Sequence, residues 1–294
     1  YLRTYVHQLG DKGFLLSKQY VERIPVPPIT KENKNLVEKI EGLVDQILVL
    51  NKQRQFLIKS DYKRLSRIRE RIEEVDKEID ELVYKLYGFS EKERRIVEEG
   101  FDDLKINEKF NLPQKYLDKK TWTFEKPEIH QIKKKIEEVG KPLKEWNINI
   151  YSGIRTGFNE AFIIDGEKRK EILDKCKTKG ERERTKKILK PVLRGRDISR
   201  YSYNWEDLWV IGTFPALKLE IDDYPSLKEY LKGFGERLKQ DGKPGHRCKS
   251  NNKWFETSHT TAYYHEFEKE KIVWQDMAGS PSFVYDKRGY YTLQ

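Results

Sequence analysis

Two tracts of apolar residues with heptad spacing lie between residues 36 and 86, and no other feature constrains the fold as strongly. The apolar positions step by four and three, which gives the narrow apolar seam of a coiled coil. The register breaks near Ser60 and Asp61, either of which is placed to cap a second helix, and Gly88 is placed to end it. The seam positions are Leu36, Ile40, Leu43, Ile47 and Leu50, then Leu65, Ile68, Ile72, Val75, Ile79, Leu82 and Leu86.

A connection of only a few residues favours an antiparallel hairpin of the two helices. Like charges would then lie side by side, with the basic stretch 61–71 beside other basic residues and the acidic stretch 73–81 facing acidic ones. Each exposed pair of this kind costs about 0.2–0.5 kcal/mol, whereas burying one large apolar side chain contributes about 1.5–3 kcal/mol. We therefore expect the hairpin, and pairing with helices of a partner or a second copy is the alternative. Ser90 and Glu93 predict a capping box for one more short helix.

The second half of the chain carries both strand and helix signals. Between residues 148 and 164 apolar and polar residues alternate around Gly153 and Gly157, which predicts a strand, a tight turn and a strand. Prolines at 25, 27 and 28 predict an extended segment. Further expected elements are helices at 129–139 and 224–238, and strands at 122–124, 208–211, 263–267, 271–274 and 283–285. The expected fold is α+β: a β-rich domain joined to a long helical hairpin or coiled-coil element.

The net charge of +10 favours a polyanionic partner. Lys/Arg and Asp/Glu number 16 and 16 in residues 30–100, 6 and 5 in 101–126, 4 and 2 in 1–29, and 33 and 26 in 127–294. The last two segments therefore carry +2 and +7, and most of the excess lies outside the helical region. No apolar run is long enough to cross a membrane and no signal peptide is present, so a cytoplasmic protein is expected.

Three strings in the second half resemble one known domain in order, spacing and composition: GIRTGFNEAFIID, KPVLRGRDISRY and KWFETSHTTAYYHEFEKEKIVWQDM. The domain is the TaqI-like target-recognition domain of type IIG restriction-modification enzymes and related adenine-N6 DNA methyltransferases, and the resemblance covers residues 122–294. It implies sequence-specific recognition of duplex DNA for a restriction-modification system, with the adenine-N6 methyltransferase or endonuclease located elsewhere. Type I specificity subunits join such domains to helices that gather methyltransferase subunits, which implies a methyltransferase partner or self-association through the helices.

The order of segments differs from that of the resembled family. There the recognition domain opens with a segment like KTWTF, closes with one like YVERIPVPPI, and is followed by helices. Here the closing segment and the helices come first. The resemblance thus implies a circular permutation, or a chain that spans parts of two recognition units. The expected domains are a recognition domain of 1–29 with 127–294, a helical coiled-coil element at 30–100 and a connector at 101–126.

The catalytic strings of the resembled enzymes do not occur in the sequence. It has no Asn-Pro-Pro-Tyr string for a flipped adenine, no glycine-rich turn for S-adenosylmethionine, and no Pro-Asp followed by Glu-x-Lys for a metal-dependent nuclease. Cys176 and Cys248 lack the spacing of a zinc ribbon. We therefore expect a specificity module without enzymatic activity, cofactor or metal. The alternatives are a nuclease that uses the region His246–His265, a helical scaffold that does not read DNA, and a fragment of a single-chain type IIG enzyme.

Two groups of residues are candidates for DNA contact. Arginine can bridge O6 and N7 of guanine and asparagine can bridge N6 and N7 of adenine, whereas lysine mostly contacts phosphate. Turns that a whole family shares can be architectural, so Arg194 and Arg196 are expected to make backbone or scaffold contacts, and the loop 239–254 is expected to read bases. The candidates are Arg155, Thr156, Asn159, Arg194 and Arg196 in the first group, and Lys243, Arg247, Lys249, Asn251, Asn252, Lys253 and Trp254 in the second.

Overall fold

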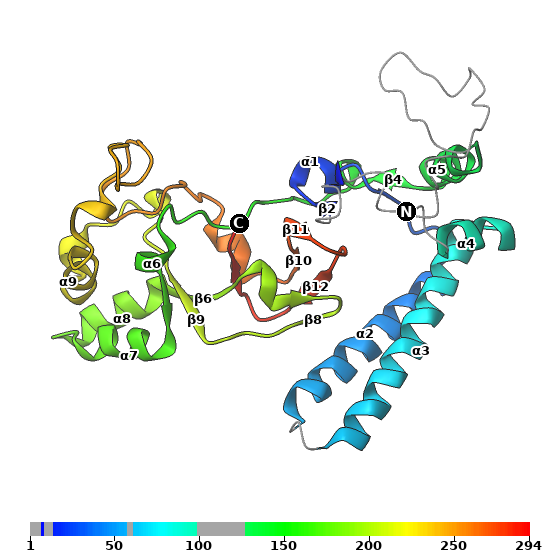
Figure 1. Cartoon of the computed structure of the whole chain (residues 1–294), viewed down its shortest axis with the longest axis horizontal. Coiled ribbons are helices and arrows are strands. Elements are labelled where there is room, and N and C mark those ends of the chain that lie inside the picture. The colour runs from blue at the N-terminus through cyan, green and yellow to red at the C-terminus, as the bar shows by residue number, and fades with distance from the viewer. Residues whose placement is uncertain (1–6, 9–13, 58–60, 99–126) are drawn as a thin grey trace, which may run out of the picture. The chain divides into compact units, whose positions relative to one another are not determined.

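The computed structural model describes residues 7–8, 14–57, 61–98 and 127–294 (Figure 1). Helices and short strands occur together along these ranges, so the predicted α+β class is confirmed. The chain divides into two compact units, Tyr1–Ile150 with Met277–Pro281, and Tyr151–Asp276 with Ser282–Gln294.

The predicted recognition domain, 1–29 with 127–294, draws on both units and stays a prediction. The permutation also stays a prediction, because the first residues of the chain lie outside the described ranges. The strand expected at 122–124 lies outside them as well.

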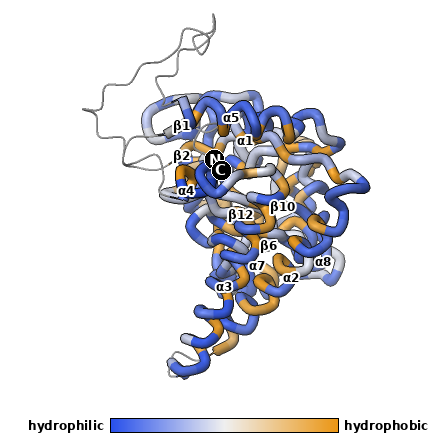
Figure 2. The backbone as a smooth tube through the Cα atoms, turned by 90° about the vertical axis from the view of Figure 1, so that its right-hand side faces the viewer, coloured by the Kyte–Doolittle hydropathy of each residue, from blue (hydrophilic) through white to orange (hydrophobic). Residues whose placement is uncertain are grey.

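A pair of long helices dominates the first unit. Helices α2 (Lys34–Phe56) and α3 (Tyr62–Leu86) pack against each other as an antiparallel pair, so the predicted hairpin is confirmed (Figure 1). Ile47 and Val75 are fully buried between them. Hydrophobic positions recur among hydrophilic ones along both helices (Figure 2), as expected for an apolar seam.

The ends of these helices follow the sequence signals. Asp61 caps α3 by accepting a hydrogen bond from Arg64 N at 3.3 Å, and Gly88 takes the left-handed conformation with a φ of 69° just after the helix. Ser90 N donates to Glu93 Oε2 at 2.7 Å and Glu93 N donates to Ser90 Oγ at 3.4 Å. This reciprocal capping box begins helix α4 (Glu91–Glu98), as predicted.

The chain just after α3 contacts further elements of the first unit. The proline segment is extended as predicted, because β3 (Pro25–Val26) pairs antiparallel with β4 (Lys141–Pro142), which follows α5 (Pro127–Val139). Tyr87 Oη donates to the Pro25 carbonyl at 2.7 Å, and Lys135 Nζ lies 2.7 Å from Glu93 Oε2. The other elements are α1 (Lys18–Val21) and a three-stranded antiparallel sheet of β1 (His7–Gln8), β2 (Phe14–Leu15) and β11 (Met277–Ala278).

Gly140 permits the close approach of β3 to the end of α5. A Cβ at this position would lie 2.6 Å from Pro25 Cβ and 2.9 Å from the Ile136 carbonyl oxygen. We expect Gly140→Ala to destabilise the protein by about 1–3 kcal/mol, because the β3 backbone must move. Gly42→Ala is the matched control. Gly42 lies on exposed helix with nothing near its Cβ position, so alanine should stabilise by about 0.5–1 kcal/mol. Urea unfolding midpoints that shift in the same direction would contradict this assignment.

The second unit is built on a four-stranded sheet in the order β13-β6-β9-β5. β13 runs parallel to β6, and the other neighbours are antiparallel. The strands are β5 (Ile163–Asp165), β6 (Leu189–Leu193), β9 (Leu208–Ile211) and β13 (Tyr291–Thr292). The helices packed with this sheet are α7 (Gly166–Asp174), α8 (Lys179–Ile188) and α9 (Pro225–Lys232).

Two apolar cores form in this unit because successive strand residues point to opposite faces. In β9, Ile211 packs with the three helices, whereas its neighbour Val210 packs with Phe214, Phe267 and Tyr291. A third, small core joins two short antiparallel pairs. These are β7 (Ile198–Ser199) with β8 (Ser202–Tyr203) and β10 (Lys271–Trp274) with β12 (Phe283–Asp286).

Several expected elements of this unit are borne out and others are wrong. The strands at 208–211, 271–274 and 283–285 are confirmed. The predicted hairpin between 148 and 164 is wrong, because α6 (Asn159–Phe162) replaces its second arm and only β5 is a strand there. The helix expected at 224–238 ends at Lys232. The strand expected at 263–267 is mostly a 3-10 helix, Tyr264–Glu268, which turns Phe267 into the core.

Candidate nucleic-acid interface

The GIRTG segment is held by the last residues of the chain. Ile154 N donates to the Thr292 carbonyl at 2.7 Å, and Ile154 forms a parallel bridge with Leu293. A Cβ at Gly153 would lie 2.6 Å from the Leu293 backbone, so no larger residue fits without movement. The segment is therefore held by the chain around β13, rather than by a hairpin with the residues that follow it.

Within this segment, Thr156 shapes the backbone and its neighbours are exposed. Thr156 is buried, its hydroxyl accepts from Phe158 N at 3.1 Å, and it donates to Asn159 Oδ1 at 2.5 Å. The exposed Arg155 donates through Nε to Gln294 Oε1 at 2.5 Å. Arg155 and Asn159 are thus the members of this group that a nucleic acid can reach.

The two arginines of the next turn have different surroundings. Arg194 is half-buried, lies 2.7 Å from Asp197 Oδ1, and also pairs with Glu206. The hydrogen bond to Asp197 raises the pKa of Arg194. Arg196 is exposed and has no ion pair or hydrogen bond with any residue in the described ranges. Arg194 therefore stabilises the turn, while the guanidinium of Arg196 is available to a phosphate or a base.

The loop 239–254 is folded around Arg247, which is only 4% exposed. Its guanidinium donates to four backbone carbonyls: Leu238 at 3.0 Å, Thr156 at 3.1 Å, Glu256 at 2.8 Å and Trp254 at 2.8 Å. Burial lowers the pKa of Arg247 to about 10, so it stays charged at neutral pH. In this structure Arg247 supports the loop from inside.

The other loop candidates divide into supporting and exposed residues. Asn252 Nδ2 donates to two backbone carbonyls at 3.0 Å each, and Lys253 Nζ lies 2.9 Å from Glu220 Oε1. Lys243, Lys249 and Asn251 are exposed. Lys249 and Asn251 make no side-chain hydrogen bond or ion pair with another residue that the structure describes. Lys253 is exposed as well but is paired, so Lys243, Lys249 and Asn251 are the exposed candidates of the loop that do not support it.

The structure brings the GIRTG segment and the loop together. The Thr156 carbonyl accepts hydrogen bonds from Arg247 Nη1 at 3.1 Å and from Ser258 N at 3.2 Å. The turn that carries Arg194 has no such bond to the loop and instead contacts Gln275, which donates to the Ile198 carbonyl at 3.2 Å. The GIRTG segment and the loop 239–254 are thus directly joined, whereas the turn that carries Arg194 is joined to neither by these bonds.

Two glutamines at this surface carried no signal in the sequence. Gln294 accepts from Arg155 and donates through Nε2 to Asp276 Oδ2 at 3.2 Å, and Gln275 donates to the backbone of the Arg194 turn. Gln275 lies within the resembled string that ends in WQDM but was not a candidate residue, and Gln294 lies in none of the three strings. The roles of both depend on segments that meet only in the fold.

The histidines of the alternative nuclease hypothesis do not gather. His246 Nδ1 lies 2.7 Å from Asp241 Oδ1, and this hydrogen bond lowers the pKa of Asp241. His265 Nε2 lies 2.9 Å from Glu266 Oε1. Among the residues with described positions, no group of three or more His, Cys, Asp or Glu side chains is arranged to hold a metal ion.

Comparison with known families finds a match for the stretch that contains the Arg194 turn and the loop 239–254. Residues 190–294 match the TaqI-like C-terminal specificity domain. The predicted resemblance is confirmed over this stretch, which does not include Arg155, Thr156 or Asn159. No curated protein matches the chain.

The match to the TaqI-like specificity domain supports a DNA-recognition role in restriction-modification. A specificity domain is not itself catalytic, and it implies a linked methyltransferase. Throughout the described part of the chain, no helix combines the length and apolar character that crossing a membrane requires.

Proposed function

We propose that the chain reads a specific sequence in duplex DNA and directs an adenine-N6 methyltransferase or endonuclease carried elsewhere. The observation that carries this proposal is the specificity-domain match over residues 190–294. The excess of +7 on residues 127–294 supports it, because cationic surface attracts DNA independently of sequence. We also propose a cytoplasmic location, which is consistent with this role.

The exposed candidates divide by chemistry. We assign phosphate contact to Lys243 and Lys249, because an ammonium is a compact charge without the planar fork that matches a base edge. Asn251 in the loop and Arg196 in the turn are assigned to base edges or the adjacent backbone. Thr156, Arg194, Arg247 and Asn252 act as supports, because each already uses its side chain inside the protein.

We assign the helical pair to a protein partner, either the methyltransferase or endonuclease subunit or a second copy of the chain. Its free end carries exposed apolar side chains, with Phe56 at 74% and Tyr62 at 78% relative exposure. We take these exposed apolar side chains as the contact surface for that partner. A helical scaffold without DNA reading remains the second candidate, because these residues alone fit it.

Duplex DNA should bind in a strongly salt-dependent way. If Arg155, Arg196, Lys243 and Lys249 each contact one phosphate, the logarithm of affinity should fall with the logarithm of salt with a slope of about −3.6. Electrophoretic titration of the whole chain against random and selected duplexes at several salt concentrations measures this slope. Incubation with S-adenosylmethionine and duplex should transfer no methyl group, and methylation by the pure chain would refute the assignment of chemistry to another component.

Variants separate reading from phosphate contact. Lys249→Gln should reduce the magnitude of the slope by about 0.9 for every sequence tested. Asn251→Ala should leave the slope unchanged and relax the preference at one base pair, by about 1–3 kcal/mol. Lys186→Gln, on exposed helix α8, is the matched control for charge and should bind like the wild type. Equal effects of all three variants would favour the scaffold.

A further inference from the structure

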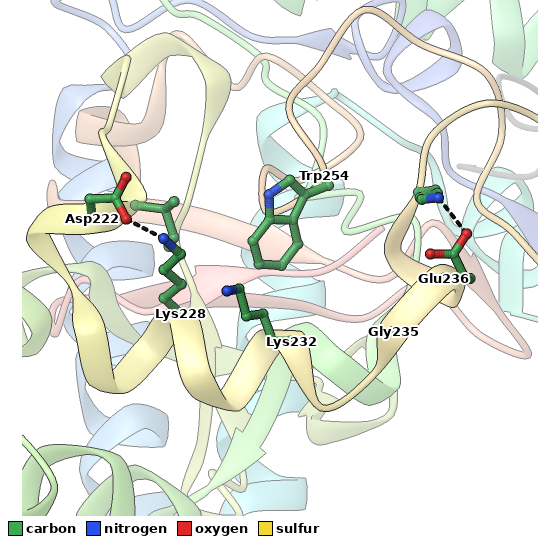
Figure 3. A pocket seen from close by; sticks show the side chains of 8 residues that line it. Asp222, Lys228, Lys232, Gly235, Glu236 and Trp254 are labelled. Atoms are coloured by element: carbon green, nitrogen blue, oxygen red, sulfur yellow. Dashed lines mark hydrogen bonds and ion pairs between the residues drawn. The ribbon is translucent and has the colours of Figure 1, made fainter.

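A cavity of about 540 Å³ opens beside helix α9 in the second unit (Figure 3). Trp254 projects into it from the loop 239–254, and Lys232 from α9 points toward the indole ring (Figure 3). The lining residues are Ile221, Asp222, Lys228, Lys232, Gly235, Glu236, Lys239 and Trp254. The volume falls in the range of small-molecule sites in proteins.

One positive charge in the cavity is not neutralised. Lys228 pairs with Asp222, and this hydrogen bond lowers the pKa of the Asp222 carboxyl. Lys239 forms an ion pair with Glu236. Lys232 is exposed and forms no ion pair or hydrogen bond with any residue whose position is described. The acidic residues at the rim are therefore occupied, and the free ammonium favours an anion.

The indole of Trp254 supplies a flat surface at a held position. Its own carbonyl accepts from Arg247 at 2.8 Å, and its ring packs edge-on against buried Phe255 with centroids 5.7 Å apart. The ring itself is half-buried, and its N–H donates to no residue in the ranges that the structure covers. A fixed aromatic face with an unused donor suits a planar ring that carries acceptors.

We propose that this cavity binds a nucleotide, whose unpaired base stacks on Trp254 and whose phosphate pairs with Lys232. Stacked aromatic rings beside lysines are the usual means of holding single-stranded nucleic acid. The carboxylate side chains of an acidic peptide would pair with Lys232 but carry no planar ring to stack on the indole, and a metal or organic cation would be repelled by Lys232. The site goes beyond duplex reading, because a base that stacks on protein is not paired. The nucleotide can come from a DNA strand or be a free mononucleotide, and the chemistry is shared.

The test compares variants of the whole chain in binding a single-stranded thymidine oligonucleotide and dTMP, both by calorimetry. Trp254→Leu should weaken binding by about tenfold or more, and Trp254→Phe should restore part of it. Lys232→Gln should weaken binding several-fold and reduce the magnitude of the salt slope for the oligonucleotide by about 0.7. Lys187→Gln should have no effect. It is the matched control, because Lys187 and Lys232 each lie in the last turn of a helix.

The outcomes are distinct. If the variants weaken binding of the oligonucleotide alone, a DNA strand is the source, and if they weaken binding of dTMP equally, a free nucleotide is the source; both results support the site. Lys232 is exposed, so Lys232→Gln reports even if Trp254→Leu does not fold. Wild-type affinity of Lys232→Gln for both ligands, or no binding of either ligand by the wild type, overturns the proposal. Duplex titration run in parallel tests the previous subsection separately, because loss of duplex binding alone leaves the cavity result intact.

Discussion

Arg247→Ala is expected to destabilise the second unit by about 3–5 kcal/mol, because it removes a charged donor from four buried or partly buried carbonyls. The carbonyls of Thr156 and Glu256 keep one other donor each, from Ser258 N and Gln240 Nε2, whereas those of Leu238 and Trp254 lose theirs. Those carbonyls belong to three separate stretches, which the guanidinium joins. Arg247→Lys should recover part of the loss, since an ammonium has three donors where the guanidinium has five. Urea unfolding followed by tryptophan fluorescence measures the change.

Lys249→Ala is the control for this prediction. Lys249 lies on the same loop, two residues away, but is exposed, so its truncation should leave stability almost unchanged and weaken DNA binding. Arg247→Ala at a temperature where it is still folded should disturb DNA binding only through the shape of the loop. A stable Arg247→Ala protein that loses base preference would show that Arg247 contacts DNA directly.

Asp286→Ala should also be among the most damaging single changes, again by about 3–5 kcal/mol, because it leaves a partly buried ammonium unpaired. Asp286 is fully buried in β12 and pairs with Lys271 directly across from it in β10. Its carboxylate also accepts from Arg288 N and Tyr290 N, both at 2.8 Å. Thermal unfolding of the whole chain measures the loss.

A double variant shows what the loss consists of. Lys271→Met with Asp286→Leu removes both charges, so it should be more stable than Asp286→Ala, although two backbone N–H groups stay without an acceptor. Asp174→Ala is the matched control, because Asp174 forms its ion pair with Arg182 at the surface and its removal should change little. If both alanine variants lower the free energy of unfolding by the same amount, the buried ion pair contributes no more to stability than the surface pair.

The helices of this chain could be predicted because their signals are local. The heptad seam lies on one helical face, and the caps at Asp61 and Ser90 act over three residues. Gly88 ends α3 through its own φ. Each of these interactions needs only a neighbour in the sequence, so the pattern is sufficient to predict the helices and their antiparallel pairing.

The strands show where a local pattern stops being sufficient. Alternation between 148 and 164 correctly indicates the buried positions Ile154, Phe162 and Ile164, but Ile148 is 48% exposed. The alternation does not indicate a partner, and Ile154 pairs with Leu293 near the end of the chain. Strand pairing is a long-range choice, because the backbone can bond with any segment that packing brings close. The predicted hairpin is wrong for this reason.

The candidate interface divides in the same way. The sequence by itself determined that a basic loop with arginine, lysine and asparagine lies in a segment that resembles a specificity domain. It could not distinguish Arg247, whose donors are used inside the protein, from Lys249, whose ammonium is exposed. Only the tertiary structure decided this, because buried carbonyls from distant stretches require donors, and the side chain at their meeting point supplies them. The cavity of Trp254 and Lys232 arises from the same kind of long-range meeting.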